Sequence, residues 1–187
     1  VTAGTFHSVC LRILRKHHEA AGYASSFTIY DTDDTKKAIQ ACMKELSIDE
    51  KTLAVRSVQS AISRAKDRLI GPRQFAAEAG CDYTLERIAN IYDCYQKRLK
   101  AGNALDFDDI IMETVKLLRE NGEIRDYYQR RYKYVCVDEY QDTNEAQFEL
   151  IKLLSGGYRN IMVVGDDDQS IYKFRGARIE NILSFEK

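Results

Sequence analysis

The sequence has no tryptophan, a single proline and no apolar run longer than a few residues. A helix needs about 20 consecutive apolar residues to span a bilayer, so we expect no membrane-spanning helix. The start, VTAGTFHSVC, also lacks the basic and apolar regions of a signal peptide. These absences predict a soluble, cytoplasmic protein.

The sequence has no large excess of either charge, because 28 lysines and arginines are balanced by 29 aspartates and glutamates. The net charge of −1 gives no global argument for a nucleic-acid or membrane partner, so any electrostatic signal has to be local. The 187 residues, 44% of them hydrophobic, suffice for one domain or two small ones with a real core.

The five cysteines form no CxxC pair and are widely separated in the sequence. Cysteine metal sites use closely spaced ligands, so this spacing favours reduced thiols, most of them at apolar positions of helices and strands. The five are Cys10, Cys42, Cys81, Cys94 and Cys136.

Helical periodicity dominates the first hundred residues, where apolar side chains recur at spacings of three and four. The segments expected to form helices begin near Phe6, Asp31, Val55, Pro72 and Leu85. Those from Val55 and from Leu85 are long and are expected to pack side by side. Residues 21–103 are therefore predicted to form a helical body.

The pattern changes after the segment KAGNALDFDD. An amphipathic helix over 107–118 precedes two short strands rich in β-branched residues, at 133–138 and 160–166. Between the strands we expect a helix with Asn144 as its N-cap and Gln147 as the capping-box partner. Strand, helix and strand in this order are typical of a parallel α/β sheet.

Acidic side chains follow both predicted strands. Asp138 and Glu139 come directly after the first strand, and the aspartates at 166–168, with Gln169, follow the second. In an open parallel sheet, ligands bind at the carboxyl ends of the strands. Like charges are costly there unless a cation neutralises them, and Mg²⁺ held by one carboxylate and substrate phosphates is a frequent solution. Solvated loop or N-cap residues are the alternative interpretation.

Four strings of the sequence closely resemble motifs of superfamily 1 DNA helicases of the UvrD, Rep and PcrA type, and they occur in that family's order. They are TFHS at 5–8, ALDFDD at 104–109, VDEYQDTN at 137–144 and VVGDDDQSIYKFRGA at 163–177. The resemblance covers the chain from end to end. It implies an α/β fold, in which residues 1–20 and 104–187 form part of a RecA-like P-loop NTPase motor domain and residues 21–103 form a mostly helical inserted subdomain.

The resemblance implies a nucleotide site at the strand ends. Asp138 matches the Walker B acid that acts on Mg²⁺, and Glu139 matches the catalytic carboxylate that polarises the attacking water. Gln169 matches a glutamine that reaches toward the γ-phosphate of ATP. The parent protein would then be an ATP-dependent 3′–5′ DNA helicase that translocates on single-stranded DNA and unwinds duplex DNA in repair or replication.

The resemblance also implies contacts with DNA. The matching positions are Thr5, Phe6, His7, Tyr172, Phe174 and Arg175. Short polar groups at 5–7 can donate hydrogen bonds to phosphates. Tyr172 and Phe174 match positions that border the single-strand channel, where bases stack on rings regardless of sequence. Many relatives have tryptophan where this chain has Phe174, which implies less ring overlap. Arg175 is a candidate coupler between the nucleotide and DNA ends of this motif.

For the string ALDFDD, the residue pattern favours a structural role. We expect Leu105 and Phe107 to pack the helical body against the sheet. Asp106, Asp108 and Asp109 are expected to cap the following helix.

One local electrostatic signal lies in the helical body, where six basic residues accompany one acid, Asp67. The six are Lys51, Arg56, Arg64, Lys66, Arg68 and Arg73. Such a patch can bind backbone phosphates, with Arg64 and Arg68 as predicted contacts, and a solvated helix face is the alternative. A non-catalytic DNA-binding module that uses these helices is therefore a second hypothesis for the chain. A regulatory relic with decayed motifs is a third.

A phosphate-binding loop of the form GxxxxGK[ST] is missing, because none of the ten glycines is followed by lysine. The chain also has no initiator methionine. We therefore expect a piece of a longer protein, with its remaining motor domains on both sides. By itself the piece is predicted neither to hydrolyse ATP at a useful rate nor to unwind DNA.

Overall fold

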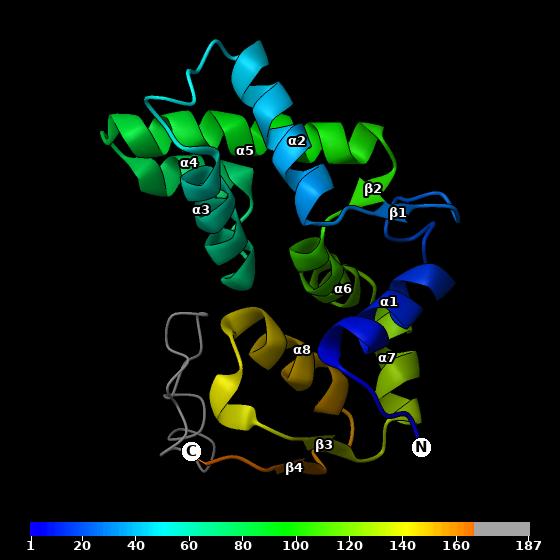
Figure 1. Ribbon diagram of the computed structural model, residues 1–187. Helices are drawn as coiled ribbons and strands as arrows, with labels where there is room; N and C mark the ends of the chain where they lie inside the picture. The colour runs from blue at the N-terminus through cyan, green and yellow to red at the C-terminus, as the bar shows by residue number, and fades with distance from the viewer. Residues whose placement is uncertain (167–187) are drawn as a thin grey trace. The chain divides into compact units, whose positions relative to one another are not determined.

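The computed structural model describes residues 1–166, and they divide into two compact units (Figure 1). The helical unit is Gly22–Ile110. The sheet unit consists of Val1–Ala21 and the segment from Ile111 onward. The fold of these residues is mixed α/β, mostly helical, with small parallel sheets. The assignment of the units to a motor domain and an inserted subdomain stays a prediction.

The helical unit is built from amphipathic helices that begin close to the expected positions. They are α2 (Thr32–Glu45), α3 (Val55–Asp67), α4 (Pro72–Ala79), α5 (Tyr83–Ala101) and the start of α6 (Phe107–Glu120). Asp31 caps α2 in a capping box with Asp34, which satisfies main-chain donors that a helix start leaves unpaired. Asp82 caps α5 without a capping box, because its side chain accepts from the amides of the two residues at 84 and 85.

The core of the helical unit lies around α5, which packs against α2, α3 and α4. Tyr92 and Tyr95 are the largest fully buried side chains of this core. The Tyr92 hydroxyl donates to the carbonyl of Ile70 at 3.0 Å, so its polar end is satisfied. The prediction that the helices from Val55 and Leu85 pack together is confirmed.

A small parallel sheet that the sequence pattern does not predict closes this unit. It pairs β1 (Thr28–Ile29) with β2 (Ala104–Leu105). The amide of Tyr30 donates to the carbonyl of Leu105 at 2.8 Å, which extends the pairing by one bond. The two ends of the helical unit are thus joined through the main chain.

The ALDFDD string begins α6 and surrounds a buried lysine. Asp106 and Asp109 form a capping box, since each carboxylate accepts from the other residue's amide, at 2.8 and 3.2 Å. Their other oxygens accept from Lys66 Nζ of α3, at 2.6 Å for Asp106 and 2.8 Å for Asp109. The expected capping is confirmed for this pair. The packing role expected of Phe107 is wrong, because its side chain is 57% exposed.

The buried lysine is held on several sides. The Tyr95 hydroxyl donates to the same Asp106 oxygen at 2.8 Å. The Gln96 amide donates to Asp109 at 3.2 Å. Burial by itself lowers the pKa of Lys66, but the carboxylates of Asp109 and Asp106 outweigh this and hold the pKa above its usual value. The network therefore joins α3 and α5 to the first turn of α6.

The sheet unit combines helices with a second parallel pair of strands. Its elements are α1 (Phe6–Lys16), the rest of α6, α7 (Gly122–Arg131), β3 (Val135–Val137), a 3₁₀ turn (Tyr140–Asp142), α8 (Glu145–Ser155) and β4 (Ile161–Val163). The predicted strand, helix and strand are confirmed, and β3 pairs with β4 in parallel. Asn144 caps α8 and forms the expected capping box with Gln147. The helix α7 was not expected.

The two faces of the β3–β4 pair differ, as the period of two requires. Val137 lies in a cluster with Tyr140 and with Ile151 of α8, and Phe6 of α1 packs against that cluster. On the opposite face, Met162 is 56% exposed. Among residues 1–166, α8 therefore packs on one face of this sheet.

Three composition-based expectations can be compared with residues 1–166. In that range no helix is at once long enough and apolar enough to cross a bilayer. All five cysteines are free. Cys10 and Cys42 are buried and Cys94 is half-buried, but Cys81 and Cys136 are exposed. The interpretation of most cysteines as core residues is wrong for this last pair.

Candidate functional site

Two loops meet at the carboxyl ends of β3 and β4, side by side in Figure 1. Asp138 and Glu139 leave β3, and Asp166 lies three residues beyond the end of β4. All three are exposed. The main chain ties the loops together, because the Val164 amide donates to the Val137 carbonyl at 2.8 Å and the Tyr140 amide donates to the Val164 carbonyl at 3.0 Å. Asp138, Glu139 and Asp166 are therefore presented at one edge of the sheet, and the predicted Asp167 and Asp168 lie outside the described residues.

Gln141 is the residue that links the two loops through its side chain. It is 1% exposed. Its Nε2 donates to Glu139 Oε2 at 2.6 Å, and its Oε1 accepts from the Asp166 amide at 3.1 Å. Sequence reasoning placed no role on Gln141, although it lies within the string VDEYQDTN. Its position inside that string was the available signal.

The backbone of Glu139 is unusual. With φ 51° and ψ 42° it lies in the left-handed region, which costs a non-glycine residue roughly 1–2 kcal/mol. The turn is held by Asp138, whose Oδ1 accepts from the Glu139 amide at 3.0 Å, and by the Gln141 bond. Strained backbone of this kind is concentrated at functional sites. Here it directs a carboxylate that Gln141 fixes in place.

The donor set fits a hard cation held mainly by a substrate. Within residues 1–166, no three histidine, cysteine, aspartate or glutamate side chains converge as a protein-only metal site requires. Mg²⁺ commonly uses one or two carboxylates together with phosphates and water, and exposed Asp138 offers such a carboxylate. Asp142, in the 3₁₀ turn that follows Glu139, has a buried Oδ1 with no hydrogen-bond partner among the described residues.

The predicted DNA-contacting residues near the N-terminus lie at the start of α1. Thr5 is the N-cap, and its hydroxyl oxygen accepts from the Ser8 amide at 3.3 Å. Phe6 packs against the sheet cluster, and His7 is half-buried, which lowers the pKa of its imidazole. Their contact with DNA stays a prediction.

Several predicted site residues lie outside the described range, which ends at residue 166. They are Gln169, Tyr172, Phe174 and Arg175. The structure thus brings together Asp138, Glu139 and Asp166 from the predicted nucleotide site, and the γ-phosphate glutamine stays a prediction.

The predicted basic patch is smaller than the sequence suggests. Lys66 is 1% exposed and bound to two carboxylates, so its inclusion in an exposed patch is wrong. The remaining basic side chains are exposed, namely Lys51, Arg56, Arg64, Arg68 and Arg73. Arg64 lies in the last turn of α3 and Arg68 is its C-cap. Within residues 1–166, neither Arg64 nor Arg68 forms an ion pair, and their contact with phosphates stays a prediction.

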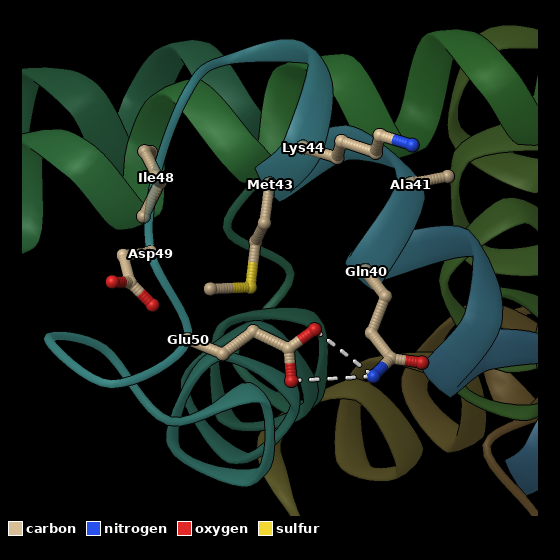
Figure 2. Close-up of a pocket in the computed structure, with 7 residues that line it drawn as sticks. All are labelled: Gln40, Ala41, Met43, Lys44, Ile48, Asp49 and Glu50. Carbon is tan, nitrogen blue, oxygen red and sulfur yellow. Dashed lines mark hydrogen bonds between the residues drawn. The ribbon is translucent and has the colours of Figure 1, made fainter.

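A hollow of about 470 Å³ lies elsewhere, in the helical unit (Figure 2). Met43 of α2 and Ile48 of the following loop line its apolar part. Its polar side is occupied by an internal pair, in which Gln40 Nε2 donates to both carboxylate oxygens of Glu50, at 3.0 and 3.2 Å. None of the predicted nucleotide or DNA residues lines it.

Comparisons with known proteins identify the family to which the chain belongs. The family model of the UvrD/REP helicase N-terminal domain matches residues 1–187, the whole chain. The chain therefore belongs to the UvrD/REP helicase family. Membership of this family is consistent with a P-loop NTPase fold for the chain.

Particular relatives support the same assignment. The ATP-dependent DNA helicase PcrA of Staphylococcus aureus strain Mu50 is 48% identical over 183 residues, which are 98% of this chain and 25% of that protein. The protein of the same name from Bacillus subtilis strain 168 is 47% identical, and that from Staphylococcus epidermidis is 46% identical, with the same coverage. The chain spans about a quarter of the length of these relatives.

Proposed function

We propose that the chain is part of the motor of an ATP-dependent DNA helicase that translocates 3′ to 5′ on single-stranded DNA and unwinds duplex DNA in repair or replication. The observation that carries the proposal is the Gln141 link, which holds Glu139 and the Asp166 loop together at the strand ends. A solvated loop would not need a buried glutamine with both ends of its amide engaged. The family membership and the relatives' printed names support the same function.

In this proposal the sheet unit belongs to a RecA-like domain and the helical unit is its inserted subdomain. Asp138 holds Mg²⁺, and the Glu139 carboxylate accepts a proton from the attacking water. Gln141 keeps that carboxylate oriented, and Gln169 contacts the γ-phosphate. Mg²⁺ neutralises charge on the phosphates when ATP is bound.

The phosphate-binding loop has to come from another part of the parent, because no GxxxxGK[ST] string occurs in this chain. We therefore expect no useful ATP hydrolysis by the chain alone. In the parent, Glu139→Gln is expected to lower the ATP hydrolysis rate at least about 100-fold while nucleotide binding persists.

The test compares the parent, its Glu139→Gln variant and the isolated chain in a coupled ATPase assay, with nucleotide binding followed by a fluorescent ATP analogue. Glu113→Gln is a matched control, since Glu113 lies in α6 and not in either loop that follows β3 or β4. ATP turnover by the isolated chain that Glu139→Gln abolishes would contradict the incomplete site. An unchanged rate in the parent variant would contradict the role of Glu139.

DNA contact by the helical unit is the second candidate function, and exposed Arg64 and Arg68 at the end of α3 favour it. The Lys66 network fixes this end of α3, so the two guanidinium groups project from a rigid support. The partners would be single-stranded and duplex DNA, bound through backbone phosphates without regard to sequence.

This candidate is tested by fluorescence anisotropy of a labelled oligonucleotide over a range of salt concentrations. The Arg64→Ala/Arg68→Ala variant is expected to bind more weakly and to reduce the slope of log affinity against log salt by roughly 0.7–0.9 per lost phosphate contact. Lys36→Ala/Lys37→Ala removes two exposed charges from α2 and serves as the control. Equal losses in both variants would mean that α3 holds no particular DNA site.

A further inference from the structure

A surface of cations and exposed tyrosine rings lies at the amino ends of β3 and β4. It consists of residues 130–134, which lead into β3, and residues 158–160, which lead into β4, and we name it the entry surface. Its rings include Tyr134, which is 77% exposed, and Tyr158, which is 48% exposed. Its cations are all exposed, namely Arg130, Arg131, Lys133 and Arg159.

Hydrogen bonds hold the two segments of the entry surface together. The Val135 amide donates to the Asn160 carbonyl at 2.9 Å, and Asn160 Nδ2 donates to the Lys133 carbonyl at 2.9 Å. Just before the first segment, Gln129 Nε2 donates to the Leu153 carbonyl at 2.8 Å. The two segments therefore form one surface, although the whole of α8 separates them in the sequence.

Positive charge is not balanced along these stretches of the chain. Residues 127–137 and 150–161 contain no aspartate or glutamate. Among residues 1–166, none of the four cations of the entry surface forms an ion pair. The acid just before the second stretch, Glu149, is already paired with Arg119 at 3.0 Å. The charge of the entry surface is therefore complementary to an anionic partner.

The backbone of Arg159 is also unusual. Its φ is 55°, in the left-handed region where glycine is the usual residue. The Arg159 amide donates to the Ser155 carbonyl at 2.9 Å, so this residue closes the turn after α8. An arginine at such a position costs more than a glycine would, and strain of this kind is concentrated at functional sites.

We propose that the entry surface is a binding site for single-stranded nucleic acid, at the opposite end of the strands from the candidate nucleotide site. A single strand presents charged phosphates and flat bases together, so it engages cations and rings at once. An acidic peptide would pair with the cations but would gain little from the exposed rings of Tyr134 and Tyr158. The proposal goes beyond the proposed function, because it needs neither the nucleotide site nor Arg64 and Arg68 of α3.

Fluorescence anisotropy of the chain with a labelled oligothymidine tests the role of the rings. Tyr134→Leu/Tyr158→Leu removes both rings but keeps apolar side chains, and we expect binding to weaken at least about 5-fold because base stacking is lost. Tyr134→Phe/Tyr158→Phe keeps the rings and should bind as the unmodified chain does. Tyr83→Leu, at a position 71% exposed in the helical unit, is the control. Unchanged binding by the first variant, or an equal loss in the control, would overturn the proposal.

The role of the cations is tested in the same assay over a range of salt concentrations. Arg131→Ala/Arg159→Ala should reduce the slope of log affinity against log salt by roughly 0.7 per lost phosphate contact. Lys36→Ala/Lys37→Ala removes two exposed charges from α2, and an equal reduction there would overturn the proposal. A labelled polyglutamate peptide is the second ligand. Tighter binding of the peptide than of the oligonucleotide at the same salt would assign the surface to acidic peptides and overturn the proposal.

In the parent, whose proposed motor also binds DNA, photo-cross-linking locates the bound strand. An oligonucleotide that contains 5-iodouracil is irradiated with the protein, and the cross-linked peptides are identified by mass spectrometry. We expect cross-links on peptides that contain Tyr134 or Tyr158, and they should persist in Glu139→Gln, in which hydrolysis is lost. Cross-links confined to other parts of the parent would overturn this proposal and leave the proposed motor function standing.

Discussion

Lys66 shows how a single side chain can be read wrongly from the sequence and still be central to the structure. Its charge suggests an exposed patch, yet its side chain is fully buried between Asp106 and Asp109. Two contacts shorter than 3 Å balance the charge, and Tyr95 completes the coordination of one carboxylate. Removing one partner from a buried network of this kind is destabilising, because the remaining charges stay buried and unpaired.

Removing the cation is expected to be severe. Lys66→Met should lower the free energy of unfolding by about 3–5 kcal/mol, because it leaves two buried carboxylates without their counter-ion. Since the folded pKa of Lys66 is raised, its contribution is present at neutral pH and is lost only at strongly alkaline pH, above the unfolded value. Urea unfolding at pH 7 measures the loss. Arg64→Met, on an exposed face of the same helix, is expected to change stability by no more than about 0.5 kcal/mol. Similar values for both variants would contradict the importance of the network.

Asp67, next to Lys66 in sequence, gives a pH dependence of the same sign, but in the acid to neutral range. Burial, and then the charge of Asp108, raise the pKa of Asp67 to about 7. The folded chain therefore holds this proton more tightly than the unfolded chain, so the contribution of Asp67 to stability falls as pH rises from about 4 to about 7. Asp67→Asn should flatten this part of the profile and stabilise the chain at pH 8 by about 1–2 kcal/mol, a value reduced by solvent screening.

Urea unfolding at pH 5, 6, 7 and 8 tests this prediction. Glu78→Gln, at an exposed position of α4, removes a carboxylate of the same kind and should leave the profile unchanged. If the free energy of unfolding of Asp67→Asn and of the unmodified chain changed with pH in parallel, the folded chain would not raise the pKa of Asp67.

At the scale of elements, the packing of α7 against α8 depends on a close approach at Gly157. A Cβ there would lie 2.9 Å from Cβ of Gln129. Gln129 cannot move freely, because its Nε2 donates to the Leu153 carbonyl of α8 at 2.8 Å. Gly157→Ala should therefore cost about 1–3 kcal/mol through overpacking.

The matched control for this substitution is Gly122→Ala at the first position of α7, where the nearest atom is a flexible Arg125 nitrogen at 3.6 Å. It should be neutral or slightly stabilising, since alanine favours helix. Thermal unfolding of both variants provides the measurement. A neutral Gly157→Ala would mean that the loop between α8 and β4 yields without cost.

Elements of the fold could be predicted from the sequence where the pattern that defines them lies within a few neighbouring residues. The start of α8 could be predicted, because its cap residues Asn144 and Gln147 are three apart. The helix α7 was missed because its sequence, GEIRDYYQRR, is rich in charge and buries only Tyr128. The β1–β2 pair has two residues in each strand, too few for a periodic pattern, and depends on pairing between segments far apart in the chain.

The same distinction applies to the candidate site. Asp138 and Glu139 follow a strand directly, so their place at the sheet edge could be predicted. The link from Gln141 to the Asp166 amide joins residues 25 apart, and the Lys66–Asp106 bond joins residues 40 apart. Contacts across such separations leave no periodic trace in the sequence. Phe107 was predicted to be buried for a related reason. The apolar spacing along α6 defines one face of the helix, but it does not say which residues of that face other segments cover.

At the scale of the whole molecule, each unit contains a hydrophobic cluster of its own. The cluster of the helical unit gathers residues from α2, α3 and α5, and that of the sheet unit gathers Val137, Tyr140 and Ile151. Clusters without shared members give local unfolding units that need not open together. A destabilising substitution in one unit should then increase local unfolding mainly in that unit.

Amide hydrogen exchange in Lys66→Met tests this separation. We expect faster exchange in α3 and α5, which the network holds, and unchanged exchange in α8 of the sheet unit. Gly157→Ala should have the reverse pattern, with faster exchange in α7 and α8 and unchanged exchange in α5. The two variants control for each other, because each lies in one unit. Equal acceleration of α5 and α8 in both variants would show that the chain opens as a single cooperative body, since a local defect would then reach both clusters through their common unfolding.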